Sequence, residues 1–218
     1  MANRSRKKKR SARGAPSSAT ALGIGEPKMD RVHFHAIAYD EQTIEERSFE
    51  SVDQALAFCG ASRATWLNVD GVHDAEVIAR IGQHFDIHPL TQEDILHTAQ
   101  RPKKEDFQHY LYIVLQMLRY SPEGGGVVSE PISLILTPKT LISFEESPED
   151  AFSPVRERLR KAHGRIRTLG CDYLAYALLD AVVDNYFLIL EHIGADIDAL
   201  EEETMETPNA NVHHRIHE

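Results

Sequence analysis

The sequence predicts an α/β fold: a mixed β-sheet covered by helices on both faces, followed by a long acidic helix. First, apolar runs typical of strands alternate with segments of helical periodicity along residues 30–168. Second, apolar side chains recur at helical spacing for about ten turns after Gly170. Third, the 218 residues are 42% hydrophobic, which is enough for one sizeable globular core.

The first half of the chain predicts a hairpin, a strand and two helices. Residues 32–38 and 43–49 are short apolar runs separated by a polar turn, so they are expected to pair. Residues 64–69 predict a third strand, which ends at Asp70-Gly71, a dipeptide typical of turns. One helix is then expected up to Phe85, and another is expected to start after His88-Pro89.

The second half predicts a meander and a basic helix. Residues 110–118 are apolar on both alternating faces, which predicts a central strand. Glycines turn the chain at 124–126, after which residues 132–136 and 141–144 add two strands. A helix with three arginines and a lysine is expected over 155–162. Residues 101–104, Arg-Pro-Lys-Lys, are expected to form a solvated loop, with phosphate binding as the alternative.

Charge is distributed unevenly along the chain. The formal net charge is −10, but the first 14 residues contribute seven positive and no negative charges, which leaves −17 for the rest. So acidic a body argues against nucleic acid as its partner. The basic start is expected to be a solvated tail, with contact to nucleic acid or to an anionic membrane surface as alternatives. We expect no membrane span, because acidic residues interrupt the most apolar helix.

Four segments follow from these patterns. We expect a basic disordered tail at 1–29, an α/β domain at 30–168, a long acidic amphipathic helix at 169–206, and the start of a further helix at 207–218 that is cut off at Glu218. Cys59 and Cys171 form no spaced pair and favour a reducing compartment.

The long helix carries an unbalanced negative charge. Between Arg167 and Arg215 there is no lysine or arginine, yet there are ten carboxylates. Five of them fall on one line of the helix: Asp180, Asp184, Glu191, Asp198 and Glu202. Like charges four residues apart oppose helix formation by about 0.2–0.5 kcal/mol per pair. This acidic stripe is therefore either a solvated face or a surface for divalent cations. The opposite, apolar side of the helix is expected to pack on a core.

Several blocks in a fixed order carry a family resemblance. The blocks are residues 66–73 (WLNVDGVH), 88–96 (HPLTQEDIL), 100–103 (QRPK), 110–114 (YLYIV), 132–136 (ISLIL), 154–158 (PVRER) and 172–174 (DYL), continuing through Asp180, Asp184 and residues 201–203 (EEE). Together they resemble the cytoplasmic domain of CorA-type magnesium channels over roughly residues 30–218. The resemblance implies a homopentameric divalent-cation channel rather than an enzyme. It also implies a membrane anchor in a C-terminal part absent from these residues, and a role for this domain in sensing Mg²⁺ on the cytoplasmic side.

The resemblance also implies metal-binding residues. Asp94 matches a residue that faces an aspartate of a neighbouring subunit, with the ion between them; that partner lies beyond residue 218. Glu93 and Asp180 match a second site, with Asp184 on the same helical face. All are acidic here, and oxygen ligands suit Mg²⁺, with Co²⁺ as a possible substitute. Some relatives have a histidine where this chain has Ala99.

Two other functions remain open from sequence. The chain could belong to a related Zn²⁺ transporter, in which His213 and His217 at helical spacing would supply imidazole ligands. It could also be a metal-dependent hydrolase that uses Glu93, Asp94, His97 and Asp180, although no nucleophile is evident.

Overall fold

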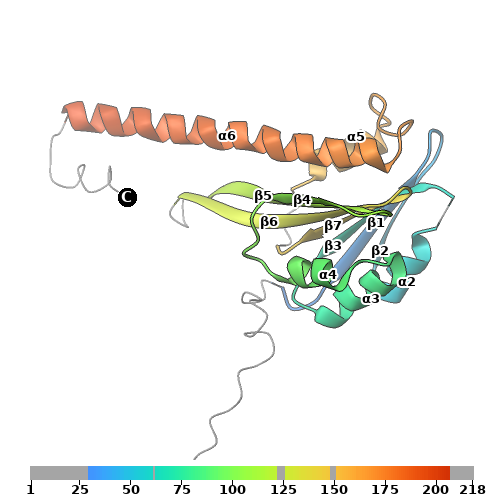
Figure 1. Ribbon diagram of the computed structural model, residues 1–218. Coiled ribbons are helices and arrows are strands. Elements are labelled where there is room, and N and C mark those ends of the chain that lie inside the picture. The colour runs from blue at the N-terminus through green and yellow to red at the C-terminus, as the bar shows by residue number, and fades with distance from the viewer. Residues whose placement is uncertain (1–28, 61, 122–125, 148–150, 207–218) are drawn as a thin grey trace, which may run out of the picture.

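The computed structural model describes residues 29–60, 62–121, 126–147 and 151–206 (Figure 1). In chain order the elements are β1 (His33–Tyr39), β2 (Ile44–Phe49), α2 (Val52–Phe58), β3 (Ala64–Asp70), α3 (Ala75–Phe85), α4 (Pro89–Leu96), β4 (Lys103–Asp106), β5 (Leu111–Ser121), β6 (Gly126–Leu136), β7 (Thr140–Glu145), α5 (Ser153–Arg160) and α6 (Cys171–Glu206). The predicted basic tail and the segment at 207–218 lie outside the described residues.

The strands form one mixed sheet in the order β2-β1-β3-β7-β6-β5-β4. β3 and β7 are parallel, whereas the other neighbouring strands are antiparallel. The predicted hairpin is confirmed as β1 and β2. The prediction that residues 110–118 form a central strand was wrong, because β5 lies beside the edge strand β4 and the middle strand is β7. β5 is apolar on both faces because a helix layer covers each face, which does not require a central position.

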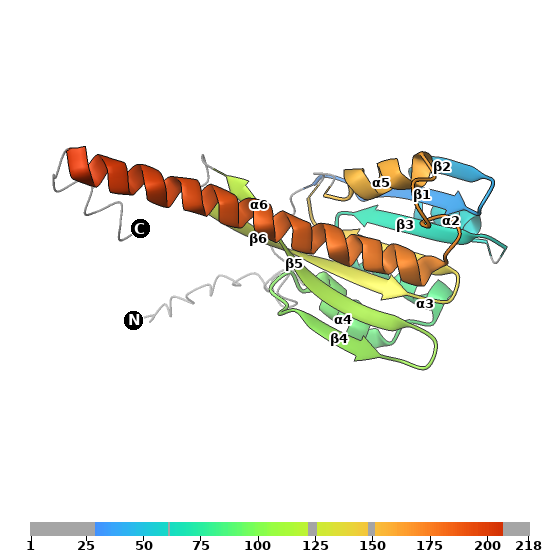
Figure 2. The same cartoon turned by 90° about the horizontal axis from the view of Figure 1, so that it is seen from above.

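Helices cover both faces of the sheet, which confirms the predicted α/β/α layering. In Figures 1 and 2, α2, α3 and α4 lie against one face, and α5 and α6 against the other. Each face has its own buried cluster. The first includes Phe34, Tyr112 and Ile95, and the second includes Trp66 and Leu174. Successive side chains of a strand point to opposite faces, so the same strands supply both clusters.

Two short elements escape the sequence patterns. α2 has seven residues and β4 has four, too few for a convincing period. The expectation of a loop at residues 101–104 was wrong at its end, because Lys103 and Lys104 open β4 and pair with Val114 and Ile113 of β5. An edge strand tolerates charged side chains, which also protect its free edge.

Helix α6 packs on the sheet only along its first part. Leu174, Leu178 and Val182 are buried, but the helix continues past the sheet (Figure 2). Ile193 and Ile197 continue the apolar side that was expected to pack on the core, but both are exposed. The prediction of apolar packing along the whole helix was therefore wrong beyond Ile189, where Tyr120 of β5 contacts the helix by stacking on His192 and donating to Asp196 Oδ2 at 2.6 Å.

Helix α6 is also long and apolar enough to cross a membrane by length and composition. An 18-residue window within Cys171–Met205 has a mean hydropathy of 1.4. Asp180 and Asp184 interrupt the apolar run without lowering its average enough to exclude it on composition, and the expectation of no membrane span stays a prediction. A single helix of this kind is weak evidence for a span, because the core helix of a soluble protein can have the same length and composition.

Candidate functional site

Helix α4 presents two adjacent carboxylates away from the core. Thr91 and Ile95 are buried, and the Thr91 hydroxyl lies 3.0 Å from the Tyr110 hydroxyl. These contacts fix the helix rotation, so Glu93 is exposed and Asp94 is half-buried at the helix surface. Glu93 forms no ion pair with any residue in the described ranges.

Asp94 is held by two side chains from the segment after α4. Lys103 Nζ donates to Asp94 Oδ2 at 2.5 Å, and Gln100 Nε2 donates to Asp94 Oδ1 at 2.8 Å. The same ammonium donates to Glu105 Oε1 at 2.9 Å. Burial lowers the pKa of Lys103, but its hydrogen bonds to Asp94 and Glu105 raise it by more, so the pKa lies above its ordinary value. Lys103 therefore stays charged and bridges two carboxylates.

The acidic stripe on α6 is free of counter-ions within the described ranges. Asp180 is half-buried and Asp184 is exposed, as are Glu191, Asp198 and Glu202. None of these five carboxylates forms an ion pair with a described residue. Their mutual repulsion remains uncompensated within this part of the chain.

One subunit does not bring the four candidate ligands together. Glu93 and Asp94 lie on the face with α2 and α3, whereas Asp180 and Asp184 lie on α6 across the sheet (Figure 1). Among the described residues, no three His, Cys, Asp or Glu side chains are grouped to hold a metal ion. A shared ion would therefore need two subunits. The donors themselves fit Mg²⁺, because they are carboxylate oxygens and Asp94 already holds an ammonium cation.

The geometry does not favour the hydrolase alternative. His97 follows α4 with its Nδ1 buried and without a hydrogen-bond partner among the described residues. Asp180 lies across the sheet from His97, so the two do not share a site. His213 and His217 lie outside the described residues.

The sequence did not identify Gln100 and Lys103 as partners of Asp94. They are six and nine residues away along the chain, a separation that no helix or strand period relates. The available clue was the lysine pair after a proline, which pointed to a solvated loop or to phosphate binding.

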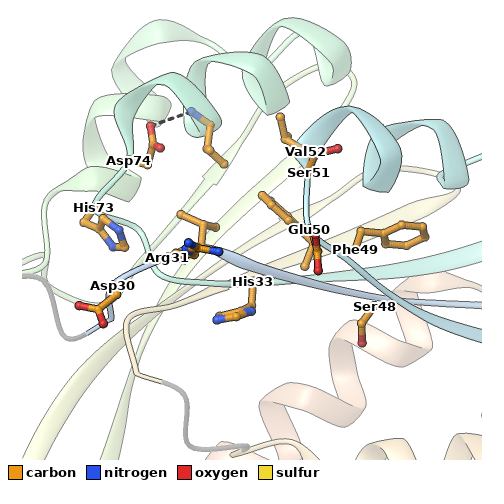
Figure 3. A pocket seen from close by; sticks show the side chains of 13 residues that line it. Asp30, Arg31, His33, Ser48, Phe49, Glu50, Ser51, Val52, His73 and Asp74 are labelled. Carbon is orange, nitrogen blue, oxygen red and sulfur yellow. Dashed lines mark hydrogen bonds between the residues drawn. The ribbon is translucent and has the colours of Figure 1, made fainter.

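A pocket of about 650 Å³ lies where β1 begins and β2 ends (Figure 3). Arg31, His33 and His73 line it together with apolar side chains. Asp74 also lines it, but its carboxylate accepts from the first backbone N–H groups of α3 and so caps that helix. None of the candidate metal ligands lines this pocket.

A partly buried polar chain links α5 to the sheet. Arg156 Nη1 donates to His35 Nδ1 at 3.1 Å, and His35 Nε2 donates to Glu46 Oε1 at 2.8 Å. The Arg156 guanidinium also lies 4.4 Å from the ring centre of Trp66. Burial, then the charge of Arg156, lowers the pKa of His35, so the neutral imidazole is favoured.

The fold and these surfaces define an α/β domain that places carboxylates on two opposite faces. The chain belongs to the family of CorA-like Mg²⁺ transporter proteins, whose family model matches residues 61–218. It is 44% identical over 180 residues to the cobalt/magnesium transport protein CorA of Thermotoga maritima, covering 83% of this chain and 51% of that protein. It is 26% identical over 172 residues to the putative metal ion transporter YfjQ of Bacillus subtilis, covering 78% and 50%. The chain thus spans about half the length of these relatives.

Solved structures share the fold at low sequence identity. The CorA magnesium transporter of Methanocaldococcus jannaschii matches with a TM-score of 0.60 at 14% identity, covering 83% of this chain and 54% of that one. The ZntB cytoplasmic domain of Vibrio parahaemolyticus matches with a TM-score of 0.54 at 14% identity, covering 84% and 69%. At this identity the likeness shows the fold alone.

Proposed function

We propose that this chain is the cytoplasmic Mg²⁺-sensing domain of a CorA-type channel that takes up Mg²⁺ and Co²⁺ across the cell membrane. The family and the 44% identity to a cobalt/magnesium transport protein support this proposal. The observation that carries the sensing role is the placement of carboxylates on opposite faces of one subunit: the Glu93 and Asp94 pair on α4, and Asp180 with Asp184 on α6.

Opposite faces suit a ring in which each subunit meets two neighbours. The α4 surface of one subunit would then face acidic residues of the next, and the metal would lie between subunits. Helix α6 supports assembly, because its side away from the sheet exposes a row of large apolar side chains: Tyr176, Val183, Phe187, Leu190 and Ile197. So large an apolar surface is typical of protein–protein contacts. Five copies form the ring in this proposal.

Repulsion between facing carboxylates makes such a contact depend on a divalent cation. With Mg²⁺ bound, the ion offsets that repulsion and holds neighbouring subunits together. When cytoplasmic Mg²⁺ falls, the subunits separate and the pore opens, which gives feedback control of uptake. Mg²⁺ shifts the equilibrium between the closed and open arrangements only by as much as its affinities for the two differ. Co²⁺ can occupy the same oxygen ligands.

The described residues favour Mg²⁺ over Zn²⁺ as the regulatory ion. The candidate ligands Glu93, Asp94, Asp180 and Asp184 are carboxylates, whereas His213 and His217, the imidazole pair proposed for Zn²⁺, lie outside the described part of the chain. The similarity to a ZntB domain concerns the fold alone.

Sedimentation velocity tests the proposed contact between subunits. We expect MgCl₂ to increase the sedimentation coefficient relative to NaCl at matched ionic strength, and Asp94→Asn or Asp180→Asn to abolish the increase. Glu41→Gln is the control, because it removes one exposed negative charge that has no ion pair among the described residues. Equal sedimentation in both salts, or equal loss in all three variants, would contradict the proposal.

A further inference from the structure

Lys103 occupies the position on Asp94 where a cation would bind. Its ammonium lies 2.5 Å from Asp94 Oδ2, and both side chains are 27% exposed, so the pair is partly screened from solvent. Gln100 holds the other carboxylate oxygen. The carboxylate is thus neutralised within its own chain before any ion arrives.

The backbone of β4 determines where this lysine points. Lys103 pairs with Val114 of β5, and its ammonium lies 5.4 Å from the ring centre of the buried Tyr112. Successive strand residues point to opposite faces, so Lys104 points away from Asp94 and forms no ion pair among the described residues. Lys103 is therefore a fixed counter-ion, and Lys104 is a natural control of equal charge.

Glu105 gives Lys103 a second partner when it leaves Asp94. The ammonium already lies 2.9 Å from Glu105 Oε1. Displacement from Asp94 therefore does not leave a partly buried charge unpaired, which would otherwise be costly. The arrangement suits exchange of a tethered monovalent cation for a free divalent one.

We propose that Lys103 sets the Mg²⁺ concentration to which the sensor responds, by occupying Asp94 until the divalent ion displaces its ammonium. This inference rests on the proposed Mg²⁺ sensing at Asp94. Lys103 acts as a tethered competitor. It raises the Mg²⁺ concentration needed for half occupancy, and it lets Asp94 discriminate against monovalent cations, whose single charge gains less from the exchange.

Paired lysine substitutions test the competition. Mg²⁺ titrations of the full 218-residue chain are followed by isothermal calorimetry in a constant NaCl background. We expect Lys103→Met to lower the half-saturating Mg²⁺ concentration about five- to tenfold, the effect of removing one positive charge within a few ångströms of the ion. Lys104→Met, which makes the same change in net charge, should lower it by less than about twofold because solvent and salt screen that site. Lys103→Arg keeps the charge and should stay within about twofold to threefold of the wild type.

A wild-type measurement covers the case in which Lys103→Met fails to fold. Reductive ¹³C-methylation labels each lysine ammonium for NMR, and we expect the Lys103 signal to move with MgCl₂ while the Lys104 signal does not. If wild-type chain binds Mg²⁺ but Lys103→Met behaves like Lys104→Met, or the Lys103 signal stays still, the competition is refuted and Mg²⁺ sensing survives. If wild-type chain shows no Mg²⁺-specific binding, both fail.

Discussion

Replacing Leu178 by alanine tests how α6 is anchored. Leu178 is fully buried between α6 and the sheet, in the cluster that contains Trp66. Truncating such a leucine removes buried apolar area and leaves a cavity, which costs about 2–5 kcal/mol. At about 2–4 °C per kcal/mol for a chain of this size, Tm should fall by about 4–20 °C. Leu190→Ala is the control on the same helix, because Leu190 is 61% exposed and should change stability by less than about 0.5 kcal/mol.

Urea unfolding measures both variants with one probe. Trp66 is the sole tryptophan of the chain and lies in the affected cluster, so its fluorescence reports loss of the α6 contact. The denaturant slope should stay constant while the midpoint of Leu178→Ala falls. Measurements at two protein concentrations separate folding from self-association. Equal destabilisation by Leu178→Ala and Leu190→Ala at low concentration would refute the assignment of buried and exposed sides.

Two further predictions concern the packing of α4 and the polar chain under α5. A side chain at Gly82 would overlap the amide of Gln92, which donates to the Ile87 carbonyl at 2.7 Å, whereas a side chain at Gly194 meets no described residue. Displacing that amide offsets the helical gain of alanine over glycine, so Gly82→Ala should be less stable than Gly194→Ala by about 1 kcal/mol in urea unfolding. The reverse order would contradict the α3–α4 contact. Burial, then Arg156, lowers the pKa of His35 below its ordinary 6.5, so its contribution to stability is complete above 6.5 and is lost as pH falls through the folded pKa. As pH falls, Tm should therefore drop less steeply in His35→Gln than in the wild type. Identical slopes would contradict a contribution of neutral His35 to stability.

The sequence anticipated the elements that have a clear period. The hairpin of β1 and β2, strand β3, helix α6, the end of α3 and the start of α4 lie close to the predicted residues. β4 escaped because its four residues are all charged, and its pairing with β5 arises from the tertiary fold. The division of the chain at residue 168 stays a prediction.

The helical pattern of α6 could not reveal which apolar side is covered. Leu178 and Leu190 lie on different sides of a helix that is apolar on both, and only the position of the sheet distinguishes them. Likewise, the acidic residues of the candidate site were identifiable from sequence, but the counter-ion of Asp94 was not. The sequence shows charge, whereas the partner of a charge depends on how β4 pairs.

The central claim is that Asp94 and Asp180 bind Mg²⁺ specifically, and melting temperature tests it most directly. For an ion that binds the folded chain with a Kd of about 1 mM, 20 mM MgCl₂ should add about 1.8 kcal/mol and raise Tm by about 4–7 °C relative to NaCl at matched ionic strength. NaCl is the essential reference, because salt alone relieves repulsion in so acidic a body. The account predicts a Mg²⁺-specific rise that disappears in Asp94→Ala and in Asp180→Ala. Equal shifts in both salts would contradict it and would identify the acidic stripe as an ordinary solvated face.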